Sequence, residues 1–351
     1  MTDIPKATAA MEGKGSYNRN SRLQEANLTS LLPLLEEAAE IVPLDPQAGM
    51  LIADYGASEG RNSMRPMGMA IDILRGRAGA AMPISITHTD LPSNDFASLF
   101  TTLESDPVSY LAGRDNVFPS AIGRTYFAPL LPPGSVTLGW SSNAVHWMSQ
   151  TVNVPDHGWA KFSASADARD AVEVQQAIDW QNFLDARSVE MRPGGRTVCQ
   201  FMGRGDDVHG FEWMAGLFWD SAAELEPLGM VSADELLRMT NPSSGRSPAQ
   251  VEEPFVDGEY NGLRLYHLSR FDAPDPFWDE YSETGDVEKL ARSWAATMRA
   301  ANGPNFVAAL DPGRDRDAFL DAVTQRLVEK ITADPQRSQS WMLLVGLEKL
   351  A

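Results

Sequence analysis

Acidic residues and glycines that could bind a nucleotide-like molecule follow two apolar runs of the sequence. Asp54, Gly56 and Gly60 come directly after the first run, and Asp90 ends the second. Glycines at the end of a strand let the backbone turn tightly and approach a ligand closely. An acid at the end of the neighbouring strand can accept hydrogen bonds from both hydroxyls of a ribose. The spacing predicts a site for a nucleotide-like cofactor.

The residues of this turn indicate which cofactor it holds. Dinucleotide sites have the pattern Gly-x-Gly-x-x-Gly, which brings a pyrophosphate onto the N-terminus of a helix. Here Glu59 stands where the phosphate would lie, and its charge repels phosphate but tolerates S-adenosylmethionine. The turn therefore favours S-adenosylmethionine over a dinucleotide, while a plain glycine turn without a ligand stays open.

A second interpretation of the same turn is a serine hydrolase. Gly56, Ser58 and Gly60 have the order Gly-x-Ser-x-Gly of a nucleophile elbow, and His267 follows later in the chain, as that class of enzyme requires. This interpretation leaves the two acids of the cofactor site without a role, so it ranks below the cofactor interpretation. The histidines are scattered without the spacing of metal ligands, and we expect no metal.

The elements that must position these residues alternate along the chain. Short apolar runs bounded by turn residues predict strands, and apolar residues three and four apart predict helices. Strands are expected over 50–56, 83–90, 134–140, 196–202, 263–270 and 341–347, and helices over 23–32, 34–42, 64–77 and 172–191. Pro33 is expected to begin the second helix. The alternation favours an α/β fold with a doubly wound, mostly parallel sheet and an antiparallel edge.

Three stretches lack the strand pattern and are rich in Trp, Phe, Met and helix-forming residues. We expect them to form a mainly helical cap over the substrate pocket, from residues 151–191, 231–258 and 272–337. The α/β core with the cofactor site is then built from residues 1–150, 192–230, 259–271 and 338–351. An aromatic-rich stretch after the strand at 196–202 is expected to line the pocket with Trp213, Met214 and Phe218.

Composition limits the partners and the compartment. The chain has 351 residues, 43% of them hydrophobic, which is enough for one large core with a subdomain. Its formal net charge of −19 repels nucleic acid and anionic membranes, so an anionic substrate needs local hydrogen-bond donors. The single cysteine, Cys199, excludes an internal disulfide, and we find no apolar run typical of an export signal or membrane span. We expect a cytoplasmic protein whose partner is a small molecule.

Five segments of the chain resemble, in the same order, the motifs of one enzyme family. They are residues 11–24, 52–62, 90–100, 142–149 and 240–251, of which the run Asp-Leu-Pro-Ser-Asn-Asp-Phe from position 90 is distinctive. The chain is similar to the SABATH family of S-adenosylmethionine-dependent methyltransferases, whose members act on the carboxylates of salicylate, benzoate, jasmonate or indole-acetate, or on xanthine nitrogens. The resemblance implies a class I methyltransferase-like fold and a homodimer. The compact chain and its departures from the family pattern favour a microbial member over a plant enzyme.

The resemblance also assigns residues to the two ligands. For S-adenosylmethionine, with S-adenosylhomocysteine as the product, it implies Ser21, Asp54, Asn62, Asp90, Leu91 and Ser120, beside the turn glycines Gly56 and Gly60. For the acceptor it implies Tyr17, Gln24, Asn143, His146 and Trp147. Asn143 stands where many members carry Tyr, which leaves the identity of the acceptor open.

These acceptor residues suit a carboxylate. The Gln24 amide and the Trp147 indole N–H are donors that, next to His146, can hold a carboxylate without a cation. A carboxylate is already ionised at neutral pH, so methyl transfer needs no general base and depends on proximity and alignment. The sequence therefore predicts a methyl ester of a small, aromatic carboxylic acid. A heterocyclic nitrogen acceptor of xanthine type, and a protein that binds the donor without catalysis, stay open as alternatives.

Overall fold

The computed structural model describes residues 22–45, 49–205 and 208–351. Its strands are β1 (Met50–Tyr55), β2 (Ile84–Asp90), β3 (Val117–Gly123), β4 (Val136–Ser142), β5 (Met191–Met202), β6 (Glu259–Tyr260), β7 (Leu263–Asp272) and β8 (Trp341–Lys349). Its helices are α2 (Arg22–Ile41), α3 (Arg61–Ala78), α4 (Phe96–Ser105), α5 (Ala166–Glu190), α6 (Glu212–Ala223), α7 (Ala233–Leu236), α8 (Pro248–Glu252), α9 (Pro276–Thr284), α10 (Val287–Ala308) and α11 (Arg316–Ala333), with a 3₁₀ turn η1 (Ala160–Phe162).

The strands form one sheet in the order β3-β2-β1-β4-β5-β8-β7-β6. The first five strands of this order pair in parallel, whereas β8 runs antiparallel to both β5 and β7, and β6 antiparallel to β7. Both central strands β1 and β2 are almost fully buried, as parallel strands covered on two faces should be. The predicted α/β fold, with a mostly parallel, doubly wound sheet and an antiparallel edge, is confirmed.

The edge strand β3 is absent from the strands predicted above. It contains Pro119, and its residues are at most half-buried. Both features are typical of an edge strand, where a proline removes no ladder hydrogen bond, but they hide the strand from a search for apolar runs. β3 matters here because it carries Ser120 next to β2.

A single helix, α2, replaces the two short helices predicted on either side of Pro33, and that prediction was wrong. The helix continues through the proline, which costs about 3 kcal/mol in a helix interior. Leu31, Leu35 and Ala38 are completely buried in the core that α2 shares with the sheet. Because this apolar face spans both sides of the proline, its burial outweighs the local preference for a break.

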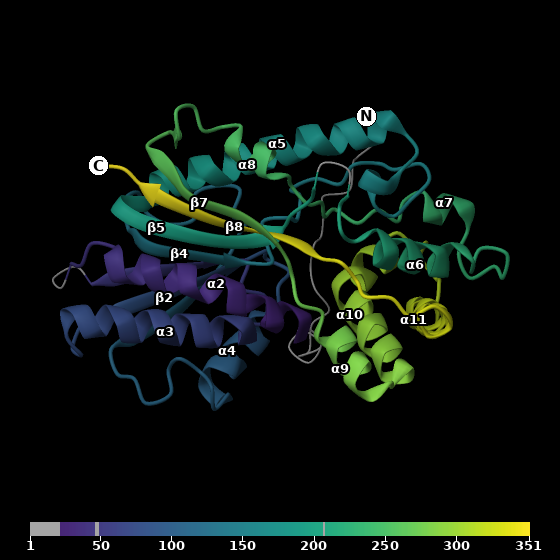
Figure 1. The fold of residues 1–351 in the computed structure, drawn as a ribbon, viewed down its shortest axis with the longest axis horizontal. Coiled ribbons are helices and arrows are strands. Elements are labelled where there is room, and N and C mark those ends of the chain that lie inside the picture. The colour runs from purple at the N-terminus through teal and green to yellow at the C-terminus, as the bar shows by residue number, and fades with distance from the viewer. Residues whose placement is uncertain (1–21, 46–48, 206–207) are drawn as a thin grey trace.

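Helices cover both faces of the sheet and one end of it (Figure 1). The helices α2, α3 and α4 lie along one face, and α5 and α8 lie along the other. The remaining helices, α6, α7, α9, α10 and α11, gather beyond one end of the sheet and form the helical cap. No helix in the described part of the chain is long and apolar enough to cross a membrane.

Three helices lie on the other side of the predicted boundary between core and cap. Residues 151–191 are expected in the cap, yet Trp180 and Phe183 of α5 pack with strand residues on the face of the sheet. Residues 192–230 are expected in the core, yet α6 buries its apolar side, including Phe218, against α10 and α11. The sequence pattern predicts a helix over 172–191 and shows 211–219 only as an aromatic-rich stretch, and packing decides which part of the fold each segment joins. We therefore assign α6 to the cap and α5 to the core, together with α8, whose Val251 packs in the same cluster as Trp180 although residues 231–258 are expected in the cap.

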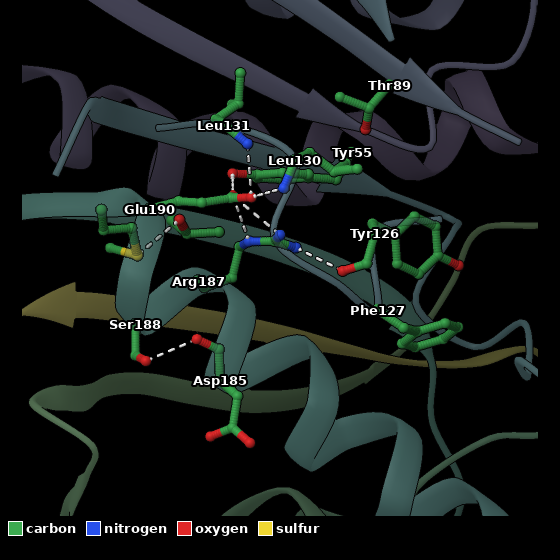
Figure 2. Close-up of polar contacts among 12 residues, drawn as sticks. Tyr55, Thr89, Tyr126, Phe127, Leu130, Leu131, Asp185, Arg187, Ser188 and Glu190 are labelled. Carbon is green, nitrogen blue, oxygen red and sulfur yellow. Dashed lines mark hydrogen bonds and ion pairs between the residues drawn. The ribbon is translucent and has the colours of Figure 1, made fainter. Parts of the chain in front are cut away.

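A buried ion pair within the last turn of α5 is hydrogen-bonded to the end of β1. Figure 2 shows the Glu190 carboxylate accepting hydrogen bonds from the Arg187 guanidinium, the Tyr55 hydroxyl and the loop backbone at 130–131. Nη2 of Arg187 lies 2.9 Å from Oε2 of Glu190, and both side chains are fully buried. Tyr55 is the last residue of β1, so this network fixes the strand end from which the glycine turn begins.

Candidate functional site

The turn after β1 is packed so tightly that two of its positions accept only glycine. Gly56 and Gly60 have φ angles of 86° and 84°, in the left-handed region that favours glycine. A Cβ at Gly56 would overlap the Cβ of Ala144, and one at Gly60 would overlap the side chain of Leu99. The N–H of Gly56 donates to the carbonyl of Thr89 at 2.8 Å. The turn therefore presents bare backbone, which suits the close approach of a ligand.

Asp90 ends β2 beside this turn, and backbone N–H groups hold its carboxylate in place. Oδ2 accepts a hydrogen bond from the N–H of Ser58 and Oδ1 accepts one from the N–H of Leu91, both at 2.7 Å. Burial raises the pKa of Asp90 to about 6, although these two hydrogen bonds act in the opposite direction. Each oxygen has a second lone pair, so the fixed carboxylate can still accept two ribose hydroxyls. The geometry suits the role predicted for this acid.

Asp54 is buried on the adjacent strand and is held by side chains. Its Oδ2 accepts a hydrogen bond from the Ser63 hydroxyl at 2.6 Å and lies 2.7 Å from Nδ1 of His88. Nε2 of His88 lies in turn 2.8 Å from the Tyr110 hydroxyl. Both side-chain contacts fall on Oδ2, so Oδ1 is the oxygen that can meet a ligand. The sequence treats His88 as one of several scattered histidines, and only the fold reveals that it positions Asp54.

The other residues predicted for the cofactor lie around these two acids where the structure describes them. Asn62 is in the first turn of α3, and Leu91 directly follows Asp90. Ser120 is exposed on β3, with its hydroxyl 2.9 Å from that of Thr87 on β2. Ser21 and Tyr17 lie outside the described residues, and Gln24 is in α2 with a side chain that is not described.

A cavity of about 120 Å³ lies between the ends of β4 and β5 and the cap. Its lining includes Asn143, His146, Trp147, Trp159, Lys161, Phe162, His209, Phe211, Ala215, Ser244, Trp294 and Met298. Three of the predicted acceptor residues, Asn143, His146 and Trp147, are thus brought together. Ala144, which lies against Gly56, stands between two of them, so the glycine turn and the cavity share a wall.

His146 and Trp147 are both held rigidly in this wall. Burial, with a smaller effect of the Arg246 charge, lowers the pKa of His146 to about 3, so the ring is neutral at neutral pH. Its Nδ1 accepts a long hydrogen bond of 3.4 Å from the N–H of Met202, which leaves Nε2 as the donor. Trp147 pairs through its backbone with Ser243 and is 8% exposed. Both rings can therefore act as neutral donors in fixed positions.

Asn143 begins the segment after β4 in a left-handed conformation, with φ of 56°. Asparagine is among the few residues other than glycine that adopt this conformation readily. Its N–H donates to the carbonyl of Gln200 at 2.8 Å, and its Nδ2 donates to the Ser142 hydroxyl at 3.0 Å. Asn143, which stands where many family members carry Tyr, therefore suits the left-handed backbone at this position.

Lys161 is a cavity residue that the sequence predictions missed. Its side chain is 6% exposed, and its ammonium pairs with the carboxylate of Glu173 on α5. Burial, together with the charges of two neighbouring arginines, lowers the pKa of Lys161 to about 7. The sequence predicts a carboxylate bound without a cation, whereas the structure puts a cation in the cavity wall. The signal that could have found it is a lone lysine in an aromatic stretch, between Trp159 and Phe162.

Comparisons with known proteins agree with this geometry. Residues 7–350 match the family model of SAM dependent carboxyl methyltransferases. The chain belongs to this family. It is 29% identical to the methyltransferase LUC1 of Fusarium sp over 62% of its own length, and this alignment spans only 56% of the fungal protein. It is 27% identical to anthranilate O-methyltransferase 2 of Zea mays, over 99% of its own length and 98% of the maize protein.

A solved structure shares the fold of this carboxyl methyltransferase family member. The structure of loganic acid methyltransferase with SAH matches it with a TM-score of 0.79 at 18% sequence identity. The match covers 97% of this chain and 99% of the other. The class I methyltransferase-like fold predicted from the sequence is therefore confirmed, and the turn and Asp90 lie in a fold that holds the methyl donor's product in that relative.

The cap wall of the cavity differs from the predicted one. Met214 and Phe218 of α6 are completely buried in the cap core, and Trp213 packs against the same core rather than lining the cavity. The residues of this stretch that do line the cavity are Phe211 and Ala215. The aromatic composition of 211–219 therefore serves packing between helices, and we correct this part of the lining to Phe211 and Ala215.

In the described part of the chain, no histidine contacts the Ser58 hydroxyl as the serine hydrolase interpretation requires. Ser58 has φ of 50°, as a nucleophile elbow would require, but its hydroxyl has no hydrogen-bond partner within the described ranges. Both ring nitrogens of His88 are occupied, by Asp54 and by Tyr110. His267 bonds to Ser269 on β7, at the other edge of the sheet. The left-handed backbone of Ser58 turns its N–H toward the Asp90 carboxylate, and this hydrogen bond accounts for the strained conformation.

The pKa of Asp90 gives a testable pH dependence of cofactor binding. A ribose hydroxyl donates to the ionised carboxylate, and the carboxylate of the free protein is protonated below about pH 6. We expect the affinity for S-adenosylhomocysteine to fall by up to about tenfold for each pH unit below this value and to be constant above it. Titration calorimetry at a series of pH values would measure this. Asp90→Asn, which cannot ionise, should bind more weakly and lose the break near pH 6, and an unbroken wild-type profile would exclude this role.

Proposed function

We propose that this protein is an S-adenosylmethionine-dependent methyltransferase that forms the methyl ester of a small, aromatic carboxylic acid. The observation that carries the proposal is the wall that the glycine turn shares with the cavity. Gly56 packs against Ala144, and Asn143 and His146, which lie one residue before and two residues after Ala144, line the cavity. A donor on the turn and an acceptor in the cavity would therefore lie on opposite sides of this short segment.

S-adenosylmethionine supplies the methyl group as a carbon bonded to a positively charged sulfur. The protein's own residues bind and align the acceptor. Trp147 and the neutral His146 offer N–H donors to one carboxylate, and Gln24 is proposed as a further donor from α2. A neutral donor holds the carboxylate without withdrawing its charge as an ammonium ion would, so the oxygen stays nucleophilic. No residue needs to remove a proton, because the acid is already ionised at neutral pH.

The cavity walls support an aromatic acceptor. Trp159, Phe162, Phe211 and Trp294 line it, and such rings pack well against a planar ligand. Closing aromatic side chains around the acceptor also excludes water, which strengthens the electrostatic interactions inside the site. The maize relative that covers nearly the whole chain is named for anthranilate, a planar aromatic acid, which agrees with this proposal.

The direct test is turnover with defined acceptors. The protein is incubated with S-adenosylmethionine and a panel of benzoate-type, anthranilate-type and aliphatic acids, and mass spectrometry detects methyl esters and S-adenosylhomocysteine in equal amounts. Ester from aromatic acids supports the proposal. A methylated purine nitrogen with no ester would favour the xanthine-type alternative. Tight donor binding without product from any acceptor would indicate a protein that only binds the donor.

Trp147→Phe tests the carboxylate contact within this proposal. The variant keeps an aromatic ring in the wall and removes the indole N–H. One hydrogen bond to a charged group contributes about 1.5–3 kcal/mol, so kcat/KM for the acid should fall about 10- to 100-fold. Affinity for S-adenosylhomocysteine, measured by calorimetry, should be unchanged because the turn is untouched. A variant with unaltered kcat/KM would show that the indole does not bind the carboxylate.

We further propose that the protein acts in the cytoplasm as a homodimer. The single cysteine is free and buried, which suits a reducing compartment, and the homodimer is implied by the family resemblance. Light scattering after size-exclusion chromatography would determine the oligomeric state. A monomer at micromolar concentration would contradict the second part of this proposal.

A further inference from the structure

A buried lysine lines the cavity where η1 meets α5. Burying an ammonium group is costly unless it is paired and hydrogen-bonded. The Lys161 side chain is 6% exposed and its ion-pair partner is Glu173. Beyond this ion pair, no hydrogen-bond partner of Nζ is found in ranges 22–45, 49–205 and 208–351. An ammonium has three N–H donors, so donors remain for a molecule in the cavity.

Glu173 neutralises Lys161 only in part, because the carboxylate is shared. Its Oε1 also lies 3.4 Å from Nη2 of Arg204, and its Oε2 accepts a hydrogen bond from the amide of Gln250. Arg246 adds a second positive charge close enough to lower the pKa of Lys161. This part of the wall therefore stays positive inside a protein with a formal charge of −19.

The remaining charged and titratable groups near Lys161 do not remove this positive potential. Burial and the neighbouring cations lower the pKa of His209 to about 4 against the opposing charge of Glu212, so that ring is neutral at neutral pH. The Glu212 carboxylate itself accepts hydrogen bonds from the backbone N–H groups of His209 and Gly210. Arg246 is buried, and its guanidinium donates hydrogen bonds to the carbonyls of Val145 and Gln176. The negative charge of Asp179 partly offsets the charge of Arg246. The local field favours an anion next to Lys161.

We propose that Lys161 binds a second carboxylate of the acceptor, so that the natural acceptor is a small aromatic dicarboxylic acid esterified on one carboxylate only. The inference rests on the proposed function. At the reacting carboxylate the new O–CH₃ bond forms as the S–CH₃ bond of the donor breaks, and the electron pair stays on sulfur. The second carboxylate remains ionised against Lys161, and the product is a mono-ester.

The chemistry of the donors separates the two carboxylates. The reacting oxygen must keep its electron density, and Trp147 and His146 offer it uncharged donors. An ammonium on the same oxygen would draw that density away and would slow attack on the methyl group. Lys161 therefore suits the carboxylate that is bound but not methylated.

Lys161→Met tests the inference, with Lys289→Met as a matched control. Methionine fills a similar apolar volume without charge, and Lys289 is an exposed lysine that is also ion-paired with a glutamate. Benzoate and the ortho, meta and para benzene dicarboxylates serve as acceptors. The wild type should prefer one dicarboxylate over benzoate by at least about tenfold in kcat/KM. Lys161→Met should lose about 10- to 100-fold on that dicarboxylate, the effect of one charged hydrogen bond, and should lose much less on benzoate.

Binding gives a readout that is independent of turnover. An anion next to Lys161 favours its charged form and raises its pKa, so the protein should take up a proton when it binds the dicarboxylate at about pH 8. Calorimetry with S-adenosylhomocysteine-loaded protein, in buffers of different ionisation enthalpy, measures this uptake. We expect it in the wild type and in Lys289→Met, and not in Lys161→Met or with benzoate.

The outcomes separate this inference from the function on which it rests. If no acid yields an ester, the proposed function fails. If benzoate is esterified but dicarboxylates are not preferred, or Lys161→Met weakens both classes equally, the second-carboxylate site is excluded while the methyltransferase proposal stands. A preference for hydroxybenzoates over every dicarboxylate would also overturn the proposed second-carboxylate site. Melting curves of the variants confirm that each one is folded.

Discussion

Replacing Gly56 with alanine is expected to reduce the affinity for S-adenosylhomocysteine by about hundredfold or more. The new Cβ would overlap the Cβ of Ala144, and an alanine in the left-handed region costs about 1–2 kcal/mol in addition. The turn must therefore shift, and a displacement of about 1 Å can cost about hundredfold in a preorganised site. Titration calorimetry measures the affinity, and urea unfolding measures the accompanying loss of stability.

Two further variants show whether the overlap with Ala144 causes the loss of affinity in Gly56→Ala. Gly76 lies in α3 with open space around its Cα, so Gly76→Ala should raise the free energy of unfolding by about 0.5–1 kcal/mol and leave binding unchanged. Adding Ala144→Gly to the Gly56 variant removes the opposing methyl group, and part of the affinity should return. If Gly56→Ala binds as tightly as the wild type, the turn is not in contact with the cofactor.

Arg187→Met is expected to lower the free energy of unfolding by about 3–5 kcal/mol, the usual effect of removing one partner of a buried ion pair. The substitution leaves the Glu190 carboxylate with the hydrogen bonds from Tyr55 and the loop at 130–131, but without its counter-charge. It also removes the guanidinium that lies 3.9 Å from the centroid of the Tyr55 ring. Urea unfolding followed by fluorescence would measure the change.

An exposed ion pair provides the control for this prediction. Arg292 and Glu288 form a pair on α10 in which both side chains are mostly exposed, so Arg292→Met should change stability by at most about 0.5 kcal/mol. Combining Arg187→Met with Glu190→Gln removes the uncompensated charge, and we expect the double variant to be more stable than Arg187→Met alone. Equal effects of Arg187→Met and Arg292→Met would mean that the buried network does not stabilise the end of β1.

The features that could be predicted from the sequence are those encoded over short spans. The strand, turn and acid around Asp54, Gly56 and Gly60 lie within a few residues of one another, and Asp90 ends the next strand in the chain. Local apolar pattern and glycine spacing are therefore enough to find them. The alternation of elements likewise predicts the sheet, because parallel strands need intervening crossovers.

The features that could not be predicted depend on contacts between distant segments. Whether α5 covers the sheet or belongs to the cap is decided by the surface that its apolar side meets, and that surface comes from strands at the end of the chain. The role of Lys161 depends on its contact with Glu173 on the next helix and on Arg204 beyond β5. His88 supports Asp54 only because their strands are adjacent in register. No local spacing encodes these relations.

The position of β8 has a consequence for synthesis of the protein. This strand lies inside the sheet, between β5 and β7, yet it is translated after both of them. Until residues 341–349 leave the ribosome, β5 and β7 each present an unpaired edge, which can pair with other chains. The nascent protein therefore passes through a stage at which most of its helices exist but its sheet is split, and we expect chaperone demand to be greatest during this interval.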